Sequence, residues 1–326
     1  MVCNPKFSVI VPTFNRADAV QRAVESLLAQ TYANLEILVI DDGSTDATAQ
    51  VLQPYRDRIR YFYQKNGGVC AARNAGLRLA TGAWVGFLDS DDEWTPRKLT
   101  AHVEAIRSNP EIIAHIVNAS IEFPGRAALD YFKTRHFRVK PNGMATKAAL
   151  PWVAGHGLWS LIPCVVSRET VQKVGWFDET LSLHEDLDFL LRVATIGPWG
   201  ASPEVAAKFV RREEPEHLSL TGRAFGKVRE DEEQMLKVLE RFRTTHNLNG
   251  SCRRAINRRM GECYFRLALH YREQRPRREF RISLRQSLAH NVTLRHIFKC
   301  LLISLPANNG LRLYRRWSGM EPICRN

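Results

Sequence analysis

Short apolar runs alternate with segments of helical periodicity over the first hundred residues. Runs rich in β-branched and aromatic residues predict buried strands at Phe7–Thr13, Leu35–Ile40, Ile59–Gln64 and Trp84–Asp89. Residues 17–30 and 69–80 place their apolar side chains at helical spacing. Alternating strands and helices predict an α/β fold, in which helices flank a Rossmann-like and mostly parallel sheet.

The pattern becomes less regular after residue 110. Residues 112–123 are compatible with a strand, and residues 124–150 are polar and predict a loop. A helix is predicted over residues 187–194, and the sequence is helical in pattern and rich in Arg from about residue 224. We expect a catalytic domain over residues 1–220 and a basic helical region over residues 221–326.

Polar clusters lie at the carboxyl ends of three of the predicted strands. They are Pro12–Thr13, Asp41–Asp42 and Asp89–Asp91. Ligands of open parallel sheets bind beyond the carboxyl ends of the strands, so we expect these segments to meet at one edge of the sheet. This convergence is a stronger indication of a site than any one segment.

Asp89, Ser90 and Asp91 have Asp-x-Asp spacing. In an extended chain both carboxylates project to the same side. Mg²⁺ and Mn²⁺ prefer carboxylate and phosphate oxygens, and they use one or two protein carboxylates when a diphosphate supplies other ligands. The alternative is a solvated acidic turn that caps a helix at Pro96. The position at a strand end favours a metal site.

Asp42 precedes Gly43 at the end of the second strand. Its carboxylate can accept a hydrogen bond from a base imide or a ribose hydroxyl, and glycine permits close approach of a ligand. An Asx turn is the alternative. A Rossmann dinucleotide site is disfavoured because no GxGxxG follows the first strand, and a P-loop is excluded because its motif does not occur. Uracil or thymine suits Asp42, so UDP or dTDP sugars are favoured, although guanine can also donate.

Two further segments place charged residues at helix starts. Arg73 and Asn74 lie near the start of a helix, where a guanidinium can bind phosphate or form a surface salt bridge. Ser182 and Glu185 have the spacing of a capping box, whereas Asp186 can serve as a general base. These two interpretations are compatible, because Glu185 can cap the helix while Asp186 faces a ligand.

Five segments in order resemble the inverting family 2 nucleotide-sugar glycosyltransferases of the GT-A fold: FSVIVPTFNR, LEILVIDDGSTD, NGGVCAARNAGL, WVGFLDSDD and HEDLDFLLRV. The resemblance implies an enzyme that transfers a sugar to a hydroxyl of a glycan or lipid-linked acceptor. It assigns Asp186 as general base with Glu185 beside it, Asp91 and Asp89 as ligands of Mn²⁺ or Mg²⁺, and Trp159 and His184 to the acceptor side. It assigns donor binding to Pro12, Thr13, Asn15, Asp42, Arg73, Asn74, Asp89 and Ser90.

Composition changes this interpretation in one place, the C-terminal region. Residues 251–326 contain 17 Lys+Arg and 4 Asp+Glu, whereas residues 1–250 contain 30 of each. Arg residues interleaved with Leu, Ile and Phe over residues 253–306 indicate peripheral contact with an anionic membrane. Packing on the catalytic domain or in a homodimer is an alternative, and nucleic acid is not expected, because no binding motif accompanies the charge.

The chain has 326 residues, and its seven scattered cysteines indicate neither a disulfide framework nor a zinc site. No signal peptide or membrane-length apolar run is found, so we expect a cytoplasmic enzyme, peripheral at the inner face of the membrane. A second hypothesis is a non-catalytic nucleotide-sugar-binding adaptor that its basic tail anchors to an anionic surface. Intact Asp89, Asp91 and Asp186 favour the enzyme.

Overall fold

The computed structural model describes residues 4–211, 228–274, 277–305 and 313–314. The chain divides into two compact units, which lie within Met1–Glu213 and Glu214–Asn326. The predicted boundary between residues 220 and 221 lies outside the described residues.

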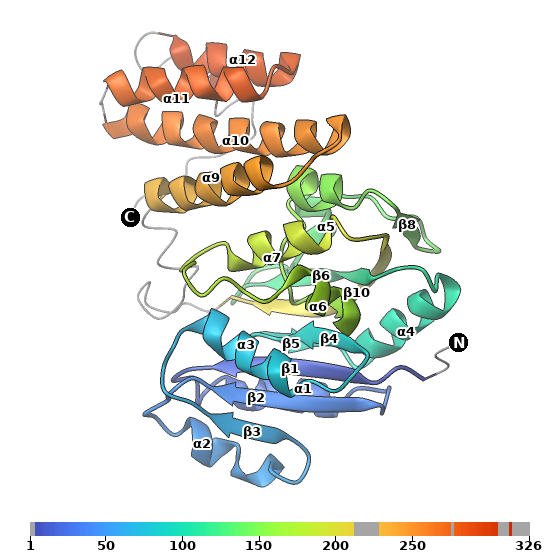
Figure 1. Ribbon diagram of the computed structural model, residues 1–326. Coiled ribbons are helices and arrows are strands. Elements are labelled where there is room, and N and C mark those ends of the chain that lie inside the picture. The colour runs from blue at the N-terminus through green and yellow to red at the C-terminus, as the bar shows by residue number, and fades with distance from the viewer. Residues whose placement is uncertain (1–3, 212–227, 275–276, 306–312, 315–326) are drawn as a thin grey trace. The chain divides into compact units, whose positions relative to one another are not determined.

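Among the described residues, ten strands of the first unit form one sheet (Figure 1). Its order is β3-β2-β1-β4-β9-β6-β10-β5, with β7 paired to β6 and β8 paired to β10. The strands are β1 (Phe7–Thr13), β2 (Leu35–Asp41), β3 (Arg60–Tyr63), β4 (Trp84–Phe87), β5 (Glu93–Trp94), β6 (Ala114–Glu122), β7 (Leu129–Asp130), β8 (Met144–Thr146), β9 (Cys164–Ser167) and β10 (Trp199–Val210).

The helices of the first unit connect these strands. They are α1 (Val20–Leu28), α2 (Thr48–Val51), α3 (Val69–Leu79), α4 (Lys98–Ser108), α5 (Tyr131–Thr134), α6 (Arg168–Val174) and α7 (Glu185–Val193), with a 3₁₀ turn at Gln53–Tyr55 and a π-helical turn at Pro151–Gly155. The predicted α/β fold is confirmed. The predicted loop over residues 124–150 is partly wrong, since it contains the short elements β7, α5 and β8.

The directions of the strands determine at which edge of the sheet the predicted polar clusters lie. The four neighbours β3, β2, β1 and β4 are parallel. Strand β9 runs antiparallel to both β4 and β6, and β10 runs parallel to β6. Strands β6 and β10 therefore have the same direction as β1 and β4. The carboxyl ends of β1, β2 and β4 lie at one edge of the sheet, and the amino ends of β6 and β10 lie at the opposite edge.

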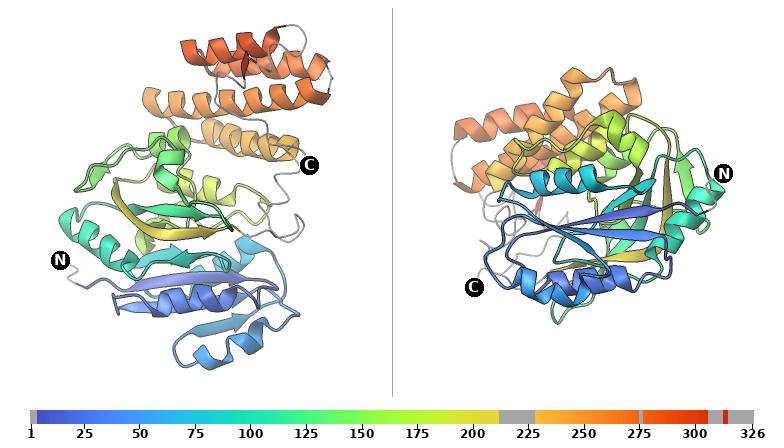
Figure 2. Two further views of the ribbon diagram at one scale, coloured as in Figure 1. Left: turned by 180° about the vertical axis from the view of Figure 1, so that it is seen from behind. Right: turned by 60° about the horizontal axis from the view of Figure 1, so that its bottom comes forward.

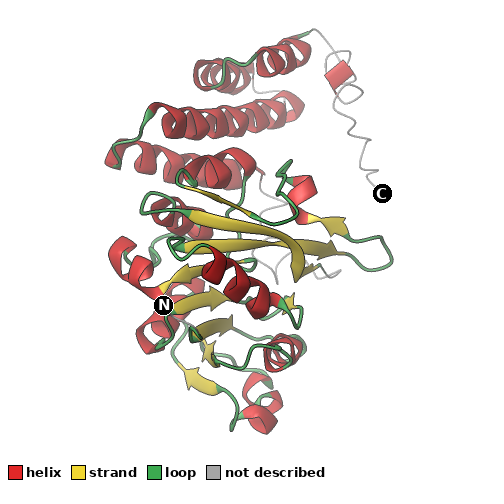
Figure 3. Cartoon of the chain, turned by 90° about the vertical axis from the view of Figure 1, so that its right-hand side faces the viewer, coloured by secondary structure: helices red, strands yellow, loops and turns green. Residues whose placement is uncertain are grey.

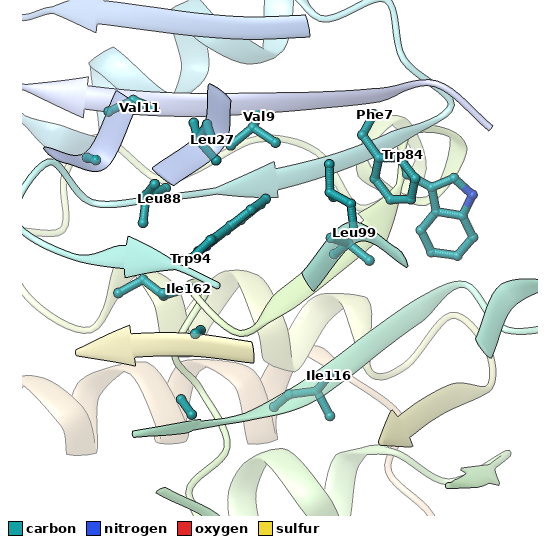
Figure 4. Packing of buried hydrophobic residues seen from close by; sticks show 14 of the residues in the cluster. Phe7, Val9, Val11, Leu27, Trp84, Leu88, Trp94, Leu99, Ile116 and Ile162 are labelled. Carbon is teal, nitrogen blue, oxygen red and sulfur yellow. The ribbon is translucent and has the colours of Figure 1, made fainter. Parts of the chain in front are cut away.

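Helices cover both faces of the sheet (Figure 2). Val9 and Val11 of β1 belong to the same buried cluster as Leu27 of α1 (Figure 4). Ile10 points to the other face, where α3 packs so closely that a methyl group on Gly76 would lie 2.5 Å from Ile10 Cγ2. Alternation of side chains along one strand thus buries both of its faces, as a strand between two helical layers requires.

The second unit is helical in its described part. Its helices are α9 (Val228–Thr245), α10 (Gly250–Gln274), α11 (Arg277–His290) and α12 (Leu294–Ser304), which lie side by side in chain order (Figures 1 and 3). Phe265 and Ala268 of α10 form a core with Cys300 and Ile303 of α12. None of the described helices combines the length and the apolar character that crossing a bilayer needs.

Candidate active site

The predicted polar segments lie at the same edge of the sheet. Thr13 pairs with Asp41 across β1 and β2. The Leu88 amide, just before the acidic segment, donates to the Ile10 carbonyl at 3.0 Å. Pro12, Thr13, Asp42 and Asp89 therefore come together from three parallel strands, because each stands where its strand ends.

Arg73 of α3 connects this edge to α7. Its side chain is 3% exposed, and its Nη2 donates to Asp89 Oδ1 at 3.0 Å. Its Nη1 donates to Asp186 Oδ1 at 2.7 Å and to Glu185 Oε1 at 2.9 Å. One buried guanidinium thus joins Asp89 to an acid pair that lies 112 and 113 residues after Arg73 in the sequence. The alternative of a surface salt bridge is wrong, because the guanidinium of Arg73 is buried in all three of these ion pairs.

Asp186 is the more exposed acid of the α7 pair, at 22% of its side chain against 11% for Glu185. Burial raises the pKa of Asp186 to about 8, against the favourable charge of Arg73, while the charges of Glu185 and Asp89 raise that pKa further. A carboxylate whose pKa lies near neutral pH is suited to take a proton from a hydroxyl group.

Helix α7 begins differently from the prediction. Its N-cap is His184, not Ser182, and His184 adopts a left-handed conformation with φ of +63° and forms no cap hydrogen bond with its side chain. The capping box of Ser182 and Glu185 is therefore wrong. The turn at His184 instead places Glu185 and Asp186 in the first turn of α7, where both meet Arg73.

The three acids of the Asp89–Asp92 segment have different environments. Burial raises the pKa of Asp91, the Asp89 charge raises it further, and Arg16 Nη2 lies 3.9 Å from Asp91 Oδ2. Asp92 is buried and accepts from the Val210 amide at 2.7 Å, which ties the segment to β10. Helix α4 has no side-chain cap, so the alternative of an acidic capping turn is wrong.

Asp89 and Asp91 fit a divalent cation. Both are hard oxygen ligands. Burial and the charge of Asp89 raise the pKa of Asp91, and a bound cation would relieve the repulsion between the two carboxylates. Within the described residues no three or more His, Cys, Asp or Glu side chains are arranged to hold a metal ion. The pair would therefore need further ligands from a bound molecule.

Asp42 is buried and organises the loop before α3. Its carboxylate accepts from the amides of Gly67 and Gly68 at 3.0 and 2.7 Å, and from Gln64 Nε2 at 2.7 Å. Asp41, not Asp42, accepts from the Ser44 amide and forms the turn. A carboxylate offers about four lone-pair positions, so Asp42 retains capacity for one more donor.

Other predicted donor-side residues lie around this loop. Asn15 has a φ of +51°, and its Oδ1 accepts from the Thr45 amide, which fixes the end of β1 to the turn after β2. Thr13 Oγ1 is buried without a hydrogen-bond partner, and Ser90 is also buried. The side-chain amide of Asn74 bonds the backbone of Phe177 through both its oxygen and its nitrogen. Donor contact by Asn74 stays a prediction.

The acceptor-side predictions, Trp159 and His184, lie in segments that flank Asp186. A hydrogen bond from the Leu161 backbone reaches Asp186, two residues after Trp159. The guanidinium of Arg135 lies 5.5 Å from the Trp159 ring centroid and 5.3 Å from that of Tyr131. Arg135 and Arg16 are site residues that were not predicted from the sequence. Arg16 belongs to the PTFNR run and was identifiable there, whereas Arg135 lies in the predicted loop without a signal.

Comparison with known proteins shows what this chain is similar to. Residues 8–153 match the model of Glycosyl transferase family 2. A protein of Rickettsia typhi named as an uncharacterized glycosyltransferase is 32% identical over 205 residues, which cover 59% of this chain and 61% of that protein. These matches show that part of this chain is similar to family 2 glycosyltransferases, and the chain spans about three fifths of that relative's length.

Two solved structures share the fold. Residues 1–349 of S. aureus TarS, in complex with UDP-GlcNAc, are 19% identical, with 97% of this chain and 93% of that fragment covered and a TM-score of 0.67. The mannosyltransferase PcManGT of Pyrobaculum calidifontis, in complex with GDP-Man and Mn²⁺, is 20% identical, with 97% and 84% covered and a TM-score of 0.61. The predicted GT-A type of α/β fold is confirmed.

Replacing Arg73 by lysine should destabilise the first unit. The compact ammonium group of lysine cannot bond Asp89 and the acids of α7 at the same time, so at least one buried carboxylate loses its partner. The free energy of unfolding should therefore fall by about 2–4 kcal/mol. Urea denaturation measures the change. Arg78→Lys, at an exposed position of the same helix, should alter it by less than about 0.5 kcal/mol. Equal losses in both variants would contradict the role of Arg73.

Proposed function

We propose that the protein is an inverting glycosyltransferase, which moves a sugar from a nucleoside-diphosphate sugar to an acceptor hydroxyl by single displacement. The observation that carries this proposal is the shared guanidinium of Arg73, which holds Asp186 and the Asp89 segment at one site. The family match over residues 8–153 supports it. So do the nucleotide sugars bound to two proteins of the same fold.

Asp186 acts as the general base. Its carboxylate takes the proton of the acceptor hydroxyl as that oxygen attacks the anomeric carbon, and the bond from this carbon to the diphosphate breaks on the opposite side. Glu185 is less exposed and bonded to Arg73, so it positions the guanidinium. Arg73 in turn fixes the orientation of Asp186.

Asp91 and Asp89 would hold a divalent cation, Mn²⁺ or Mg²⁺. When bound, it supplies Lewis-acid stabilisation of the negative charge on the departing diphosphate. The protein would contribute these two carboxylates to the ligand set of the ion. The Mn²⁺ bound to PcManGT supports use of a divalent ion.

Asp42 recognises the donor base. Its remaining lone pair accepts the imide N–H of uracil or thymine, which favours UDP or dTDP sugars. Pro12 and Thr13 line the same edge of the sheet, and the hydroxyl of Thr13 provides an unused polar atom there. GDP sugars are the alternative, since PcManGT binds GDP-Man in the same fold.

The acceptor approaches from the side of Trp159 and His184. Both neighbour the segment that bonds Asp186. We assign to this side a hydroxyl of a glycan or of a lipid-linked glycan, with the Trp159 ring as a stacking surface for a sugar.

Lipid-linked acceptors agree with the surface of α12. Leu294, Phe298, Leu301 and Leu305 follow helical spacing, and Leu294 and Leu301 are 87% and 61% exposed. Arg295 and Lys299 stand on the same helix, in the region that carries the basic excess of the chain. An exposed apolar stripe flanked by cations suits the surface of an anionic bilayer, and we propose that α12 contacts the membrane there.

Replacing Asp186 by asparagine should lower kcat by about 10²–10⁴-fold while donor affinity changes little, because only proton transfer is lost. In the wild type, kcat/KM should rise with pH up to about 8 and then level, since the deprotonated carboxylate is the active form. Steady-state kinetics measures both. Asp57→Asn, an exposed aspartate of the same unit, serves as control. An undiminished kcat in Asp186→Asn would refute the assignment.

Manganese-dependent thermal stabilisation by a panel of nucleotide sugars tests the donor site. At a ligand concentration of about 100 Kd, binding contributes about 2.7 kcal/mol, so the preferred donor with Mn²⁺ should raise the Tm by several degrees. EDTA or Asp91→Asn should remove the metal-dependent part, whereas Glu93→Gln, the neighbouring acid that faces Arg22, should retain it. A panel without any manganese-dependent shift would count against the proposed function.

Replacing Leu301 by aspartate should weaken binding to vesicles that contain phosphatidylglycerol by about tenfold or more, because burial of one leucine contributes about 1.5–3 kcal/mol. Co-sedimentation measures the bound fraction. Val205→Asp, an exposed apolar residue of the first unit, should bind like the wild type. Equal binding of the wild type to neutral phosphatidylcholine vesicles would exclude the basic residues from this contact.

A further inference from the structure

A cavity of about 550 Å³ lies in the first unit, apart from the carboxylate site. Its walls are α4, the segment around β8, and the starts of β6 and β10. Because β6 and β10 run in the same direction as β4, their amino ends lie at the opposite edge of the sheet from Asp89. The cavity is therefore distinct from the proposed donor and acceptor sites.

A chain of buried basic side chains ends at this cavity. Lys98 Nζ lies 2.8 Å from His102 Nε2, and His102 Nδ1 lies 2.7 Å from His115 Nδ1. His115 Nε2 lies 2.9 Å from Ser202 Oγ, and both His115 and Ser202 line the cavity. Lys98, His102 and His115 are at most 1% exposed.

The backbone is shaped to hold this chain. His115 pairs with Gly200 across β6 and β10, and a Cβ at Gly200 would lie 2.8 Å from His115 Cδ2. Lys98 Nζ lies 3.9 Å from the centroid of the Trp94 ring, which offers a π face to the amine. The absence of a side chain at Gly200 thus leaves space for the imidazole ring of His115 on the neighbouring strand.

The chain of hydrogen bonds delivers a hydroxyl to the cavity. Burial lowers the pKa of His115 to about 3 and that of His102 well below its ordinary value, so both rings are neutral at pH 7. Each neutral ring donates through one nitrogen and accepts through the other. When His115 Nε2 donates to Ser202 Oγ, the Ser202 hydroxyl is available to donate to a ligand. When His115 Nε2 instead accepts from the Ser202 hydroxyl, Ser202 Oγ can accept a hydrogen bond from the ligand.

The rest of the lining identifies the class of ligand. Ser108, Asn109 and Asn142 supply neutral polar groups, and Ile112 and Met144 supply apolar ones. The carboxylates of Glu104 and Glu204 also line the cavity and oppose an anion, while Arg97 is paired with both at 3.5 and 3.4 Å. Neutral donors and acceptors beside apolar atoms match a sugar ring, and the volume lies in the range of small-molecule pockets.

We propose that this cavity is a second binding site of the first unit, which takes a neutral sugar and bonds one of its hydroxyl groups to Ser202 at the end of the Lys98–His102–His115 chain. The site does not depend on the proposed transfer reaction. A nucleotide sugar is unsuited to it, because Glu104 and Glu204 would repel the diphosphate.

Saturation-transfer NMR with free glucose, mannose and N-acetylglucosamine tests the site. At least one sugar should give a signal with the wild type and with Asp186→Asn, which leaves the cavity unchanged. Ala105→Trp, which fills the cavity from a half-buried position of α4, should abolish this signal. Ala29→Trp, at an exposed position after α1, should retain it. Ser202→Ala should weaken binding about fivefold, the effect of one neutral hydrogen bond.

Three results would overturn the proposal. They are the absence of a signal for all three sugars, a signal that persists in Ala105→Trp, and a response to orthophosphate that Ala105→Trp removes, which would indicate an anion site. Ser108→Trp, from an exposed position of the same wall, replaces Ala105→Trp if thermal unfolding shows that the first variant does not fold.

Discussion

A buried positive charge with three carboxylate partners is the constraint on which the rest of the site depends. A guanidinium removed from water is unstable unless its charge is paired, and Arg73 finds its partners only when the end of β4 and the start of α7 meet. The partly buried carboxylates in turn need a positive charge beside them. The fold therefore assembles metal-binding and base-bearing segments through the same interaction that stabilises them.

The carboxylates that lie near the ends of strands have different roles, because their surroundings differ. Asp92 bonds a backbone amide and serves the sheet, while Asp91 stays partly exposed beside Asp89. Asp42 anchors two glycine amides yet keeps capacity for a donor. In each case the hydrogen-bond partners, more than the residue type, separate a structural acid from one available to a ligand.

The sheet and the edge that carries the site could be predicted from the sequence. Apolar runs such as Phe7–Thr13 specify buried parallel strands, and parallel strands necessarily end at one edge. The bond between Arg73 and Asp186 could not be predicted, since it spans 113 residues and no local pattern encodes it. The capping box failed for a related reason, because the left-handed turn at His184 overrides a spacing that fits many sequences.

The buried chain from Lys98 to Ser202 shows another limit of the sequence. Lys98 and His102 are one helical turn apart and look like an exposed polar face, whereas His115 lies within a strand. Only the packing of α4 against β6 and β10 reveals that these three side chains are inside.

The contact between Gly76 and Ile10 has a consequence for how the protein can vary. Helix α3 rests on β1 at a separation that leaves no space for a methyl group, and the same helix carries Arg73 one turn earlier. The absence of a side chain at position 76 thus sets the distance between α3 and β1, and with it the position of the Arg73 guanidinium relative to the sheet. A larger side chain at position 76 would push α3 away from β1 and would move Arg73 relative to Asp89, although Gly76 itself is not among the predicted ligand-binding residues.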